Sequence, residues 1–317
     1  MALWKTAYRM LAPGGRRGKL LIFIFHQVLR EPDPLRPYEP DAEQFDWMVQ
    51  HIARNFSVLP LADAAARLAA GSLPPAAACI TFDDGYRNNA ELALPILRRH
   101  GAVATFFVAS GFLGQGRMWN DDIIEAVRQL GSADADWRAY GLGVHRLTTP
   151  ADRLQCLADV LPRLKYFPHA ERASVAREVA RAAGVAEESS MMMEAEHLAQ
   201  LIASGMEIGA HTHSHPILGQ IGPEEARAEI ARGRSELERM TGHPIRLFAY
   251  PNGDTRRDLG QRDVDLVRDL GFACAVITDP GFAVAATNPY LLPRFTPWDR
   301  TPGRFAMRCS MALAGRL

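Results

Sequence analysis

The segment AAACITFDDGY, residues 76–86, joins a strongly apolar run to a polar turn. The run 76–82 is short, apolar and bounded by turn signals, which predicts a buried strand. Asp83 and Asp84 follow at its carboxyl end, before Gly85. Because neighbouring side chains of an extended segment point to opposite sides, the two carboxylates can take different roles. A capped turn without chemistry is the alternative, since Asp-Gly is a common turn pair.

Similar apolar runs recur along the chain and alternate with helical patterns. The runs lie at 20–25, 56–59, 76–82, 103–108, 206–210, 245–250, 273–278 and 291–295. Strands that alternate with helices predict βα units and a parallel sheet. The number of runs, with no dinucleotide-binding glycine fingerprint, favours a barrel over an open doubly wound sheet. In such barrels the active site lies at the carboxyl ends of the strands.

Two parts of the chain depart from this alternation. Residues 120–200 are helical in pattern, rich in Ala, Arg and Glu, and contain no strand run, so we expect a helical insertion on a barrel of residues 20–317. Residues 1–19 predict a basic, solvated N-terminal arm, with contact to a membrane surface as the alternative. The apolar run at 20–25 is too short for a membrane span or a secretory signal. We therefore expect a cytoplasmic protein, with peripheral membrane attachment as the alternative.

The overall composition excludes some classes of partner. The chain has 317 residues, with 36 basic and 36 acidic side chains and a formal net charge of zero. No global charge excess therefore points to nucleic acid. The four cysteines, at 79, 156, 274 and 309, are widely spaced and form no CxxC pair. This spacing predicts neither a zinc knuckle nor a redox motif, and it favours free thiols in a reducing compartment.

A cluster of histidines follows the predicted strand 206–210, in the segment HTHSHP at 211–216. His211 and His215 are four residues apart, so one helical turn would bring both rings to the same point. Neutral imidazoles are common ligands for zinc and similar metals. Together with Asp84 they would leave coordination positions open for water and substrate, as catalytic sites do. A polar loop that binds no metal is the alternative.

Other predicted strands also end in polar groups. In FAYPNG, residues 248–253, backbone N–H groups after Pro251 are candidate donors to an oxyanion. His26 directly follows the strand at 20–25, and Arg294 lies in the last strand. Taken singly, such residues are more often structural. Their shared position at carboxyl strand ends predicts that they form one site with Asp83 and Asp84.

Over about residues 20–295 the sequence resembles the polysaccharide deacetylases of carbohydrate esterase family 4, the nodulation-type deacetylase homology domain. TFDDGY at 81–86 matches the first family motif, which implies Asp83 as the catalytic base and Asp84 as a metal ligand. HTHSHP matches the second, which implies His211 and His215 as ligands and Thr212 as an orienting residue. The resemblance also implies the fold, an α/β distorted (β/α)7 barrel, here with the helical insertion.

FAYPNG looks like the third motif, which implies that Asn252 donates its backbone N–H to the oxyanion. Tyr250 and His213 are the other residues expected beside the substrate. The sequence departs from the family where Ala249 replaces the Arg that normally pairs with the base.

A second departure concerns the catalytic acid, because no histidine follows His243. In this respect the chain is similar to the circularly permuted branch that includes poly-N-acetylglucosamine deacetylases. That branch implies His26 as the general acid and Arg294 as the partner of the base. His213 is the second candidate for the acid.

The resemblance implies metal-dependent removal of N-acetyl groups from sugars, with release of acetate, in exopolysaccharide biosynthesis. The substrate is a polysaccharide or its oligosaccharide or lipid-linked precursor, and no nucleic acid is expected as a partner. The cofactor is a divalent metal, with zinc expected and cobalt or nickel as alternatives. The alternative functions are an O-acetyl esterase, another amide hydrolase on the same fold, a non-catalytic glycan-binding relic, and a metal-storage or structural protein.

Overall fold

The computed structural model describes residues 2–114, 116–131, 134–186 and 191–316. Contacts within the chain divide it into two compact units. The barrel unit comprises Met1–Glu31, Tyr38–Leu113 and Met193–Leu317, and the helical unit comprises Pro32–Pro37 and Gly114–Met192. In the described residues, no helix is both long enough and apolar enough to cross a membrane.

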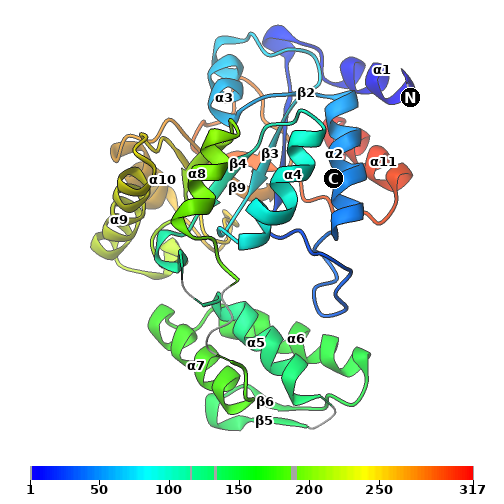
Figure 1. The fold of residues 1–317 in the computed structure, drawn as a ribbon. Coiled ribbons are helices and arrows are strands. Elements are labelled where there is room, and N and C mark those ends of the chain that lie inside the picture. Colours follow the sequence, from blue (N-terminus) through cyan, green and yellow to red (C-terminus); the bar gives the residue numbers. More distant parts are fainter. Residues whose placement is uncertain (1, 115, 132–133, 187–190, 317) are drawn as a thin grey trace. The chain divides into compact units, whose positions relative to one another are not determined.

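The barrel unit contains a nearly closed barrel of parallel strands surrounded by helices, which confirms the distorted (β/α)7 barrel (Figure 1). In spatial order the strands are β1 (Leu20–Phe25), β3 (Ala77–Phe82), β4 (Thr105–Val108), β7 (Glu207–Ala210), β8 (Leu247–Ala249), β9 (Cys274–Pro280) and β10 (Leu292–Arg294). The short β2 (Ser57–Val58) pairs with the start of β3. A bridge between Phe23 and Phe295 brings the last segment back to β1.

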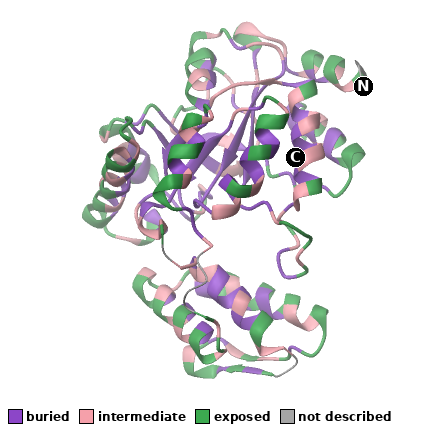
Figure 2. Ribbon diagram, viewed as in Figure 1, coloured by how far each residue is buried: buried purple, intermediate pink, exposed green. Residues whose placement is uncertain are grey.

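Helices pack around these strands, and their outer faces are exposed whereas the strands are buried (Figure 2). The α-helices of this unit are α1 (Ala2–Leu11), α2 (Ala42–Asn55), α3 (Leu61–Ala70), α4 (Leu94–Arg99), α8 (Ala195–Ala203), α9 (Pro223–Thr241), α10 (Gln261–Asp269) and α11 (Pro302–Leu313). Short turns of 3-10 or π-helix lie at Gly15–Arg17, Asn89–Ala93, Ser110–Phe112 and Leu218–Gln220. Every residue of β1 and β3 is buried, as expected for parallel strands covered on both faces.

Alternation along the strands divides the apolar residues between two clusters. Leu20 and Ile22 of β1 join one cluster with Ala77 and Cys79 of β3, and this cluster fills the barrel interior. The alternate residues of the same strands, such as Phe23, belong to the other cluster, which lies between the strands and the surrounding helices. Because the side-chain period of a strand is two, the next inward positions fall at the carboxyl ends of the strands. The fold therefore presents those positions to the mouth of the barrel.

The helical unit has α5 (Trp119–Leu130), α6 (Pro150–Lys165) and α7 (His169–Ala182), packed around a core of its own. It also contains an antiparallel pair, β5 (Ala135–Trp137) and β6 (Gly143–His145), with a 3-10 turn at Arg138–Tyr140 between them. The sequence pattern, which indicated a mostly helical insertion with no strand run, did not reveal these two strands. Strands of three residues are too short to produce a detectable periodic pattern.

The expected solvated arm at residues 1–19 is wrong over residues 2–12, because α1 packs against α2 and α11. Tyr8 is fully buried and stacks on Phe56 with ring centroids 4.5 Å apart. Its hydroxyl donates to the carbonyl of Ala306, at 3.0 Å. The basic residues of this segment alternate with apolar ones at helical spacing, so charge count alone was misleading.

Candidate active site

Four of the predicted site residues continue the inward positions of barrel strands. His26 continues the inward series of Leu20 and Ile22, and Asp83 continues that of Ala77 and Cys79. By the same period-two rule, Arg294 follows Leu292 on β10 and His211 follows Gly209 on β7. The side-chain alternation that builds the core therefore also brings ionisable groups together at one end of the barrel.

Three side chains converge as a candidate metal site: Asp84, His211 and His215. All three are buried. Asp84 Oδ1 lies 3.4 Å from Nε2 of each histidine, and the two Nε2 atoms are 3.2 Å apart. Ligand atoms about 2.1 Å from a tetrahedral ion would lie about 3.4 Å from one another. The donor set and its spacing therefore fit a divalent cation.

A backbone contact fixes one of these rings. His211 Nδ1 lies 2.7 Å from the carbonyl oxygen of Ala249. If Nδ1 carries the proton, it donates to this carbonyl, and the lone pair of Nε2 is directed toward Asp84. Burial alone would raise the pKa of Asp84, but the neighbouring histidines hold it below its ordinary value. The carboxylate therefore stays ionised, as a metal ligand requires.

Backbone strain is concentrated at the same place. Among the described residues, five non-glycine positions have positive φ, and four of them lie in the predicted motifs. Their φ values are 76° at Asp84, 64° at Thr212, 59° at His215 and 62° at Asn252. Such conformations cost free energy and persist only where surrounding contacts enforce them, which is common at functional sites.

Thr212 enforces the turn between the two histidines. Its Oγ1 donates to the carbonyl of His211, at 2.5 Å, and accepts from the N–H of His215, at 3.1 Å. The hydroxyl thus closes the loop that brings His215 back beside His211. This geometry is what an orienting residue would provide.

Helix α9 holds this loop from outside. Glu229 accepts hydrogen bonds from the N–H groups of His213 and Ser214, at 3.1 and 2.8 Å. One turn further along, Gly233 leaves room for the loop, because a Cβ there would lie 2.5 Å from the carbonyl carbon and oxygen of Thr212. Sequence reasoning missed both residues, although their spacing of four places them on one face of a helix.

His213 itself is engaged away from the candidate metal ligands. Its Nδ1 lies 2.8 Å from Glu236 Oε2 and 3.1 Å from Ser110 Oγ. The Ser110 hydroxyl also donates to Glu236, at 2.6 Å. The arrangement ties the loop to α9 and to the turn after β4, and it does not bring His213 into the metal cluster.

Asp83 is paired with Arg294 inside the barrel. The guanidinium donates to both carboxylate oxygens, from Nη1 at 2.8 Å and Nη2 at 2.7 Å, and both residues are almost fully buried. Arg294 Nε also donates to the carbonyl of Ile277, at 2.9 Å. Burial alone would raise the pKa of Asp83, but the Arg294 charge holds it below its ordinary value. Arg294 is thus the arginine that pairs with Asp83 in this chain.

His26 directly follows β1, and Asp83 directly follows the neighbouring strand β3, whose Phe82 is paired with Phe25. The N–H of Asp83 donates to the carbonyl of Phe25, at 2.9 Å, so the two segments stay side by side past the strand ends. The carbonyl of His26 accepts a hydrogen bond from the side chain of Asn89, at 2.8 Å, which anchors the segment after β1. The structure therefore brings His26 to the same end of the barrel as the metal ligands.

The two remaining predicted residues differ in placement. Asn252 lies in the turn after β8, and its carbonyl accepts from Thr278 Oγ1 at 2.6 Å. Tyr250 is buried beside Phe248, and the carboxylate of Asp263 on α10 contributes to a raised pKa of its hydroxyl, after burial. Tyr250 and Phe248 both belong to the apolar cluster that faces the surrounding helices.

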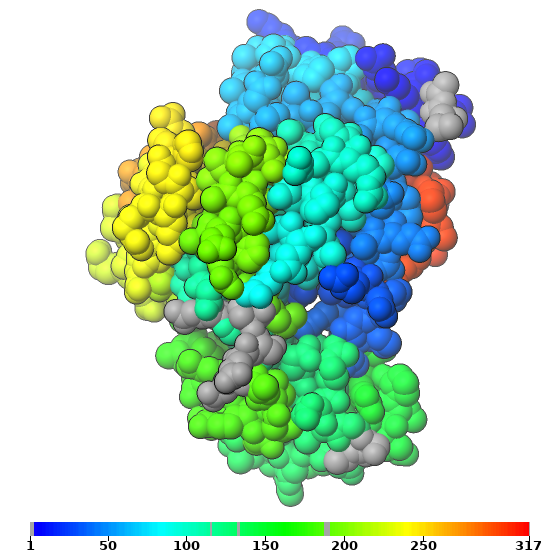
Figure 3. Space-filling view, viewed as in Figure 1, coloured from blue at the N-terminus to red at the C-terminus, as the bar shows by residue number. Residues whose placement is uncertain are grey.

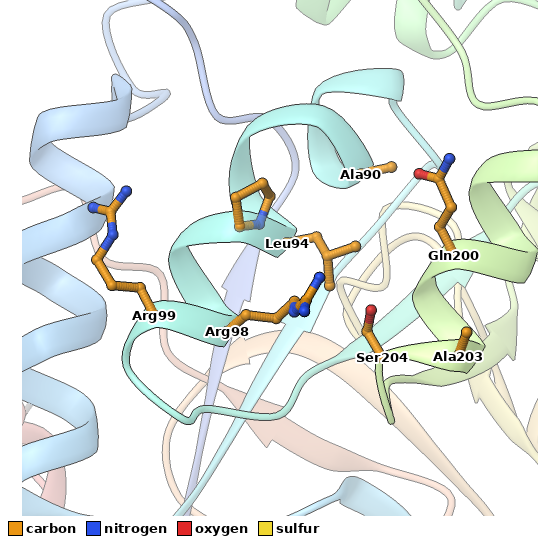
Figure 4. A pocket seen from close by; sticks show the side chains of 8 residues that line it. Ala90, Leu94, Arg98, Arg99, Gln200, Ala203 and Ser204 are labelled. Atoms are coloured by element: carbon orange, nitrogen blue, oxygen red, sulfur yellow. The ribbon is translucent and has the colours of Figure 1, made fainter.

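A surface hollow lies elsewhere on the barrel unit, between α4 and α8 (Figure 4). Its polar lining includes Arg98, Gln200 and Ser204. None of the predicted site residues lines it, so we do not assign it to the active site.

Comparison with known proteins agrees with the fold and with the family resemblance. The family model for polysaccharide deacetylases matches residues 70–136 and 180–275, about half of the chain. No curated protein matches the sequence.

Several solved structures are similar over most of their length. The deacetylase PplD of Streptococcus pyogenes, in complex with acetate, has 17% identity and a TM-score of 0.62, and the match covers 93% of this chain and 98% of that one. IcaB from Ammonifex degensii has 19% identity and a TM-score of 0.58, with coverage of 95% and 98%. A de-N-acetylase from Aggregatibacter actinomycetemcomitans has 12% identity and a TM-score of 0.58, with coverage of 92% and 99%. At these identities the likeness shows a shared fold. Because the family model covers half of the sequence, the chain belongs to the polysaccharide deacetylase family, whose activity is the deacetylation of glycans.

Proposed function

We propose that the protein hydrolyses the N-acetyl group of an N-acetylated sugar and requires a divalent cation, with zinc as the first choice. The substrate would be a polysaccharide or its oligosaccharide precursor, in exopolysaccharide biosynthesis. The observation that carries the proposal is the pairing of the three-residue ligand set with a second buried carboxylate, Asp83. A site that only binds metal or glycan has no need of that carboxylate or of the arginine that fixes it.

The ion would be held by Asp84, His211 and His215. Such an ion supplies Lewis-acid polarisation of the acetyl carbonyl and of a nucleophilic water. Asp83 would accept the water proton as the general base. Its two hydrogen bonds to Arg294 keep it ionised and hold the carboxylate in one orientation.

Amide cleavage also needs an acid, because an amine leaves only after its nitrogen is protonated. His26 would supply that proton, since it follows β1 beside the start of the Asp83–Asp84 segment and is outside the ligand set. The turn at Asn252 and Gly253, both with positive φ, would direct a backbone N–H to the developing oxyanion.

The test is mass spectrometry of N-acetylglucosamine oligomers, free and lipid-linked, after incubation with metal-depleted enzyme resupplied with zinc, cobalt or nickel. We expect loss of acetyl groups and release of acetate only with metal. His215→Ala should abolish metal retention, measured by elemental analysis. His213→Ala is the matched control in the same loop and should retain the metal. Hydrolysis of acetyl esters without any amide turnover would instead identify an esterase.

A further inference from the structure

The two ends of the sequence have an unusual charge distribution. Residues 1–30 contain six basic side chains and no acidic one, and residues 300–317 contain four basic side chains and no acidic one. Because the whole chain is neutral, residues 31–299 carry an excess of ten acidic side chains. Basic side chains without acidic ones are therefore concentrated at both ends of the sequence, although the net charge gives no sign of it.

The fold brings these two segments together. Helix α1 packs against α11, and both pack against α2 on one side of the barrel unit (Figures 1 and 3). Within the described residues of α1 and α11, Arg308 is the only cation with a carboxylate partner, Asp299 at 2.7 Å. Lys5, Arg9 and Arg304 are exposed, so their charges act outward.

The same two helices also expose large apolar side chains. Leu3 and Met10 on α1 are 74% and 72% exposed, and Met307 and Met311 on α11 are 51% and 38% exposed. Leu3 and Met10 are seven residues apart, and Met307 and Met311 are four apart, so each pair lies on one face of its helix. We call the exposed cations and apolar residues of these two helices the terminal face: Leu3, Lys5, Arg9, Met10, Arg304, Met307 and Met311.

We propose that the terminal face binds the surface of an anionic lipid bilayer. A surface rich in cations alone would also suit nucleic acid, but exposed apolar side chains on the same two helices are suited to the boundary between headgroups and acyl chains. The acidic excess of residues 31–299 would be repelled by the same surface, which favours an orientation with the terminal face toward the lipid. The binding is peripheral, and it does not depend on the proposed enzymatic activity.

The test is co-sedimentation of the full chain with vesicles of phosphatidylcholine, alone or mixed with phosphatidylglycerol, over a range of salt concentrations. We expect binding only to the anionic vesicles, and weaker binding as salt increases. Each Lys or Arg near such a surface contributes about fivefold in binding, so the triple variant K5Q/R9Q/R304Q should lose roughly 100-fold. The control R227Q/R239Q/R246Q removes three exposed arginines elsewhere and should bind as the wild type does.

A second variant and its control test the contribution of the exposed apolar side chains to vesicle binding. L3Q/M10Q should weaken vesicle binding without changing its dependence on salt, whereas V144Q/L154Q alters exposed apolar residues of the helical unit and should not. Thermal unfolding of all four variants should match the wild type closely, because exposed substitutions change stability little. The proposal is overturned if the wild type ignores anionic vesicles, binds both vesicle types equally, or binds duplex DNA more tightly than vesicles at the same salt. Equal losses in a variant and its control would also overturn it.

Discussion

The buried pair between Asp83 and Arg294 allows a sharp test of how the site is built. Both residues are almost fully buried, and the guanidinium satisfies both carboxylate oxygens. Arg294→Met keeps much of the side-chain volume but removes the charge. The carboxylate of Asp83 is then left buried without its cation, and an unpaired buried charge strongly destabilises the folded state.

The magnitude follows from the two contacts. A hydrogen bond to a charged group contributes about 1.5–3 kcal/mol, and removing one partner of a buried pair costs about 3–5 kcal/mol. We therefore expect Arg294→Met to lower the free energy of unfolding by about 3–5 kcal/mol near neutral pH. Asp83→Asn together with Arg294→Met leaves no buried charge at this pair, so the double variant should be more stable than Arg294→Met alone.

The pH dependence gives a second signature. In the wild type the pKa of Asp83 is lowered, so the pair contributes stability above the unfolded pKa of about 4 and loses it as the pH falls. In Arg294→Met, burial without the cation raises that pKa, and stability is lost as the pH increases above about 4. The difference between the two proteins should therefore widen from pH 4 to pH 7.

The assay is urea unfolding of the chelator-treated wild type, both single variants and the double variant, at several pH values. A non-additive cycle, with the double variant recovering stability relative to Arg294→Met, supports the buried pair. The reasoning is wrong if the changes in unfolding free energy of the two single variants sum to that of the double variant within about 0.5 kcal/mol. It is also wrong if the stability lost in Arg294→Met does not depend on pH.

Three further predictions concern activity and the loop. Asp83→Asn should retain the metal but reduce acetate release by about 10²–10⁴-fold, and near-normal turnover would exclude it as the base. His26→Ala should impair amide hydrolysis far more than hydrolysis of an activated acetyl ester, with unchanged metal content; equal loss on both substrates would exclude it as the acid of the amine leaving group. Gly233→Ala should weaken zinc affinity in a competition titration, because the added Cβ would meet the backbone of Thr212. The control Gly222→Ala adds a Cβ that faces open space and should leave the zinc affinity unchanged. Equal affinities of the two variants would show that α9 does not position the loop of His211–His215.

The sequence predicted the parts of the fold that follow from local periodicity. Apolar runs located the strands, and the polar groups after them, such as Asp84 and His211, did assemble at one end of the barrel. The side-chain alternation of strands explains this success, because the inward series of β1, β3, β7 and β10 end in site residues. The same rule, applied strictly, would have placed Tyr250 on the outer side of β8, with Phe248.

Other features depend on contacts between distant segments. The pairing of Asp83 with Arg294 needs the barrel to close between β1 and the segment after β10, which no local pattern reports. The support of the histidine loop by Glu229 depends on how closely α9 approaches it, and a single glycine decides that approach. Likewise, the burial of Tyr8 depends on α11, almost three hundred residues away.

The most direct test of the central claim is anomalous diffraction from crystals of the zinc-loaded protein. We predict one strong peak within about 2.0–2.2 Å of Nε2 of His211, Nε2 of His215 and a carboxylate oxygen of Asp84. A peak on His213 with none beside Asp84, or no peak at this end of the barrel, would contradict the account.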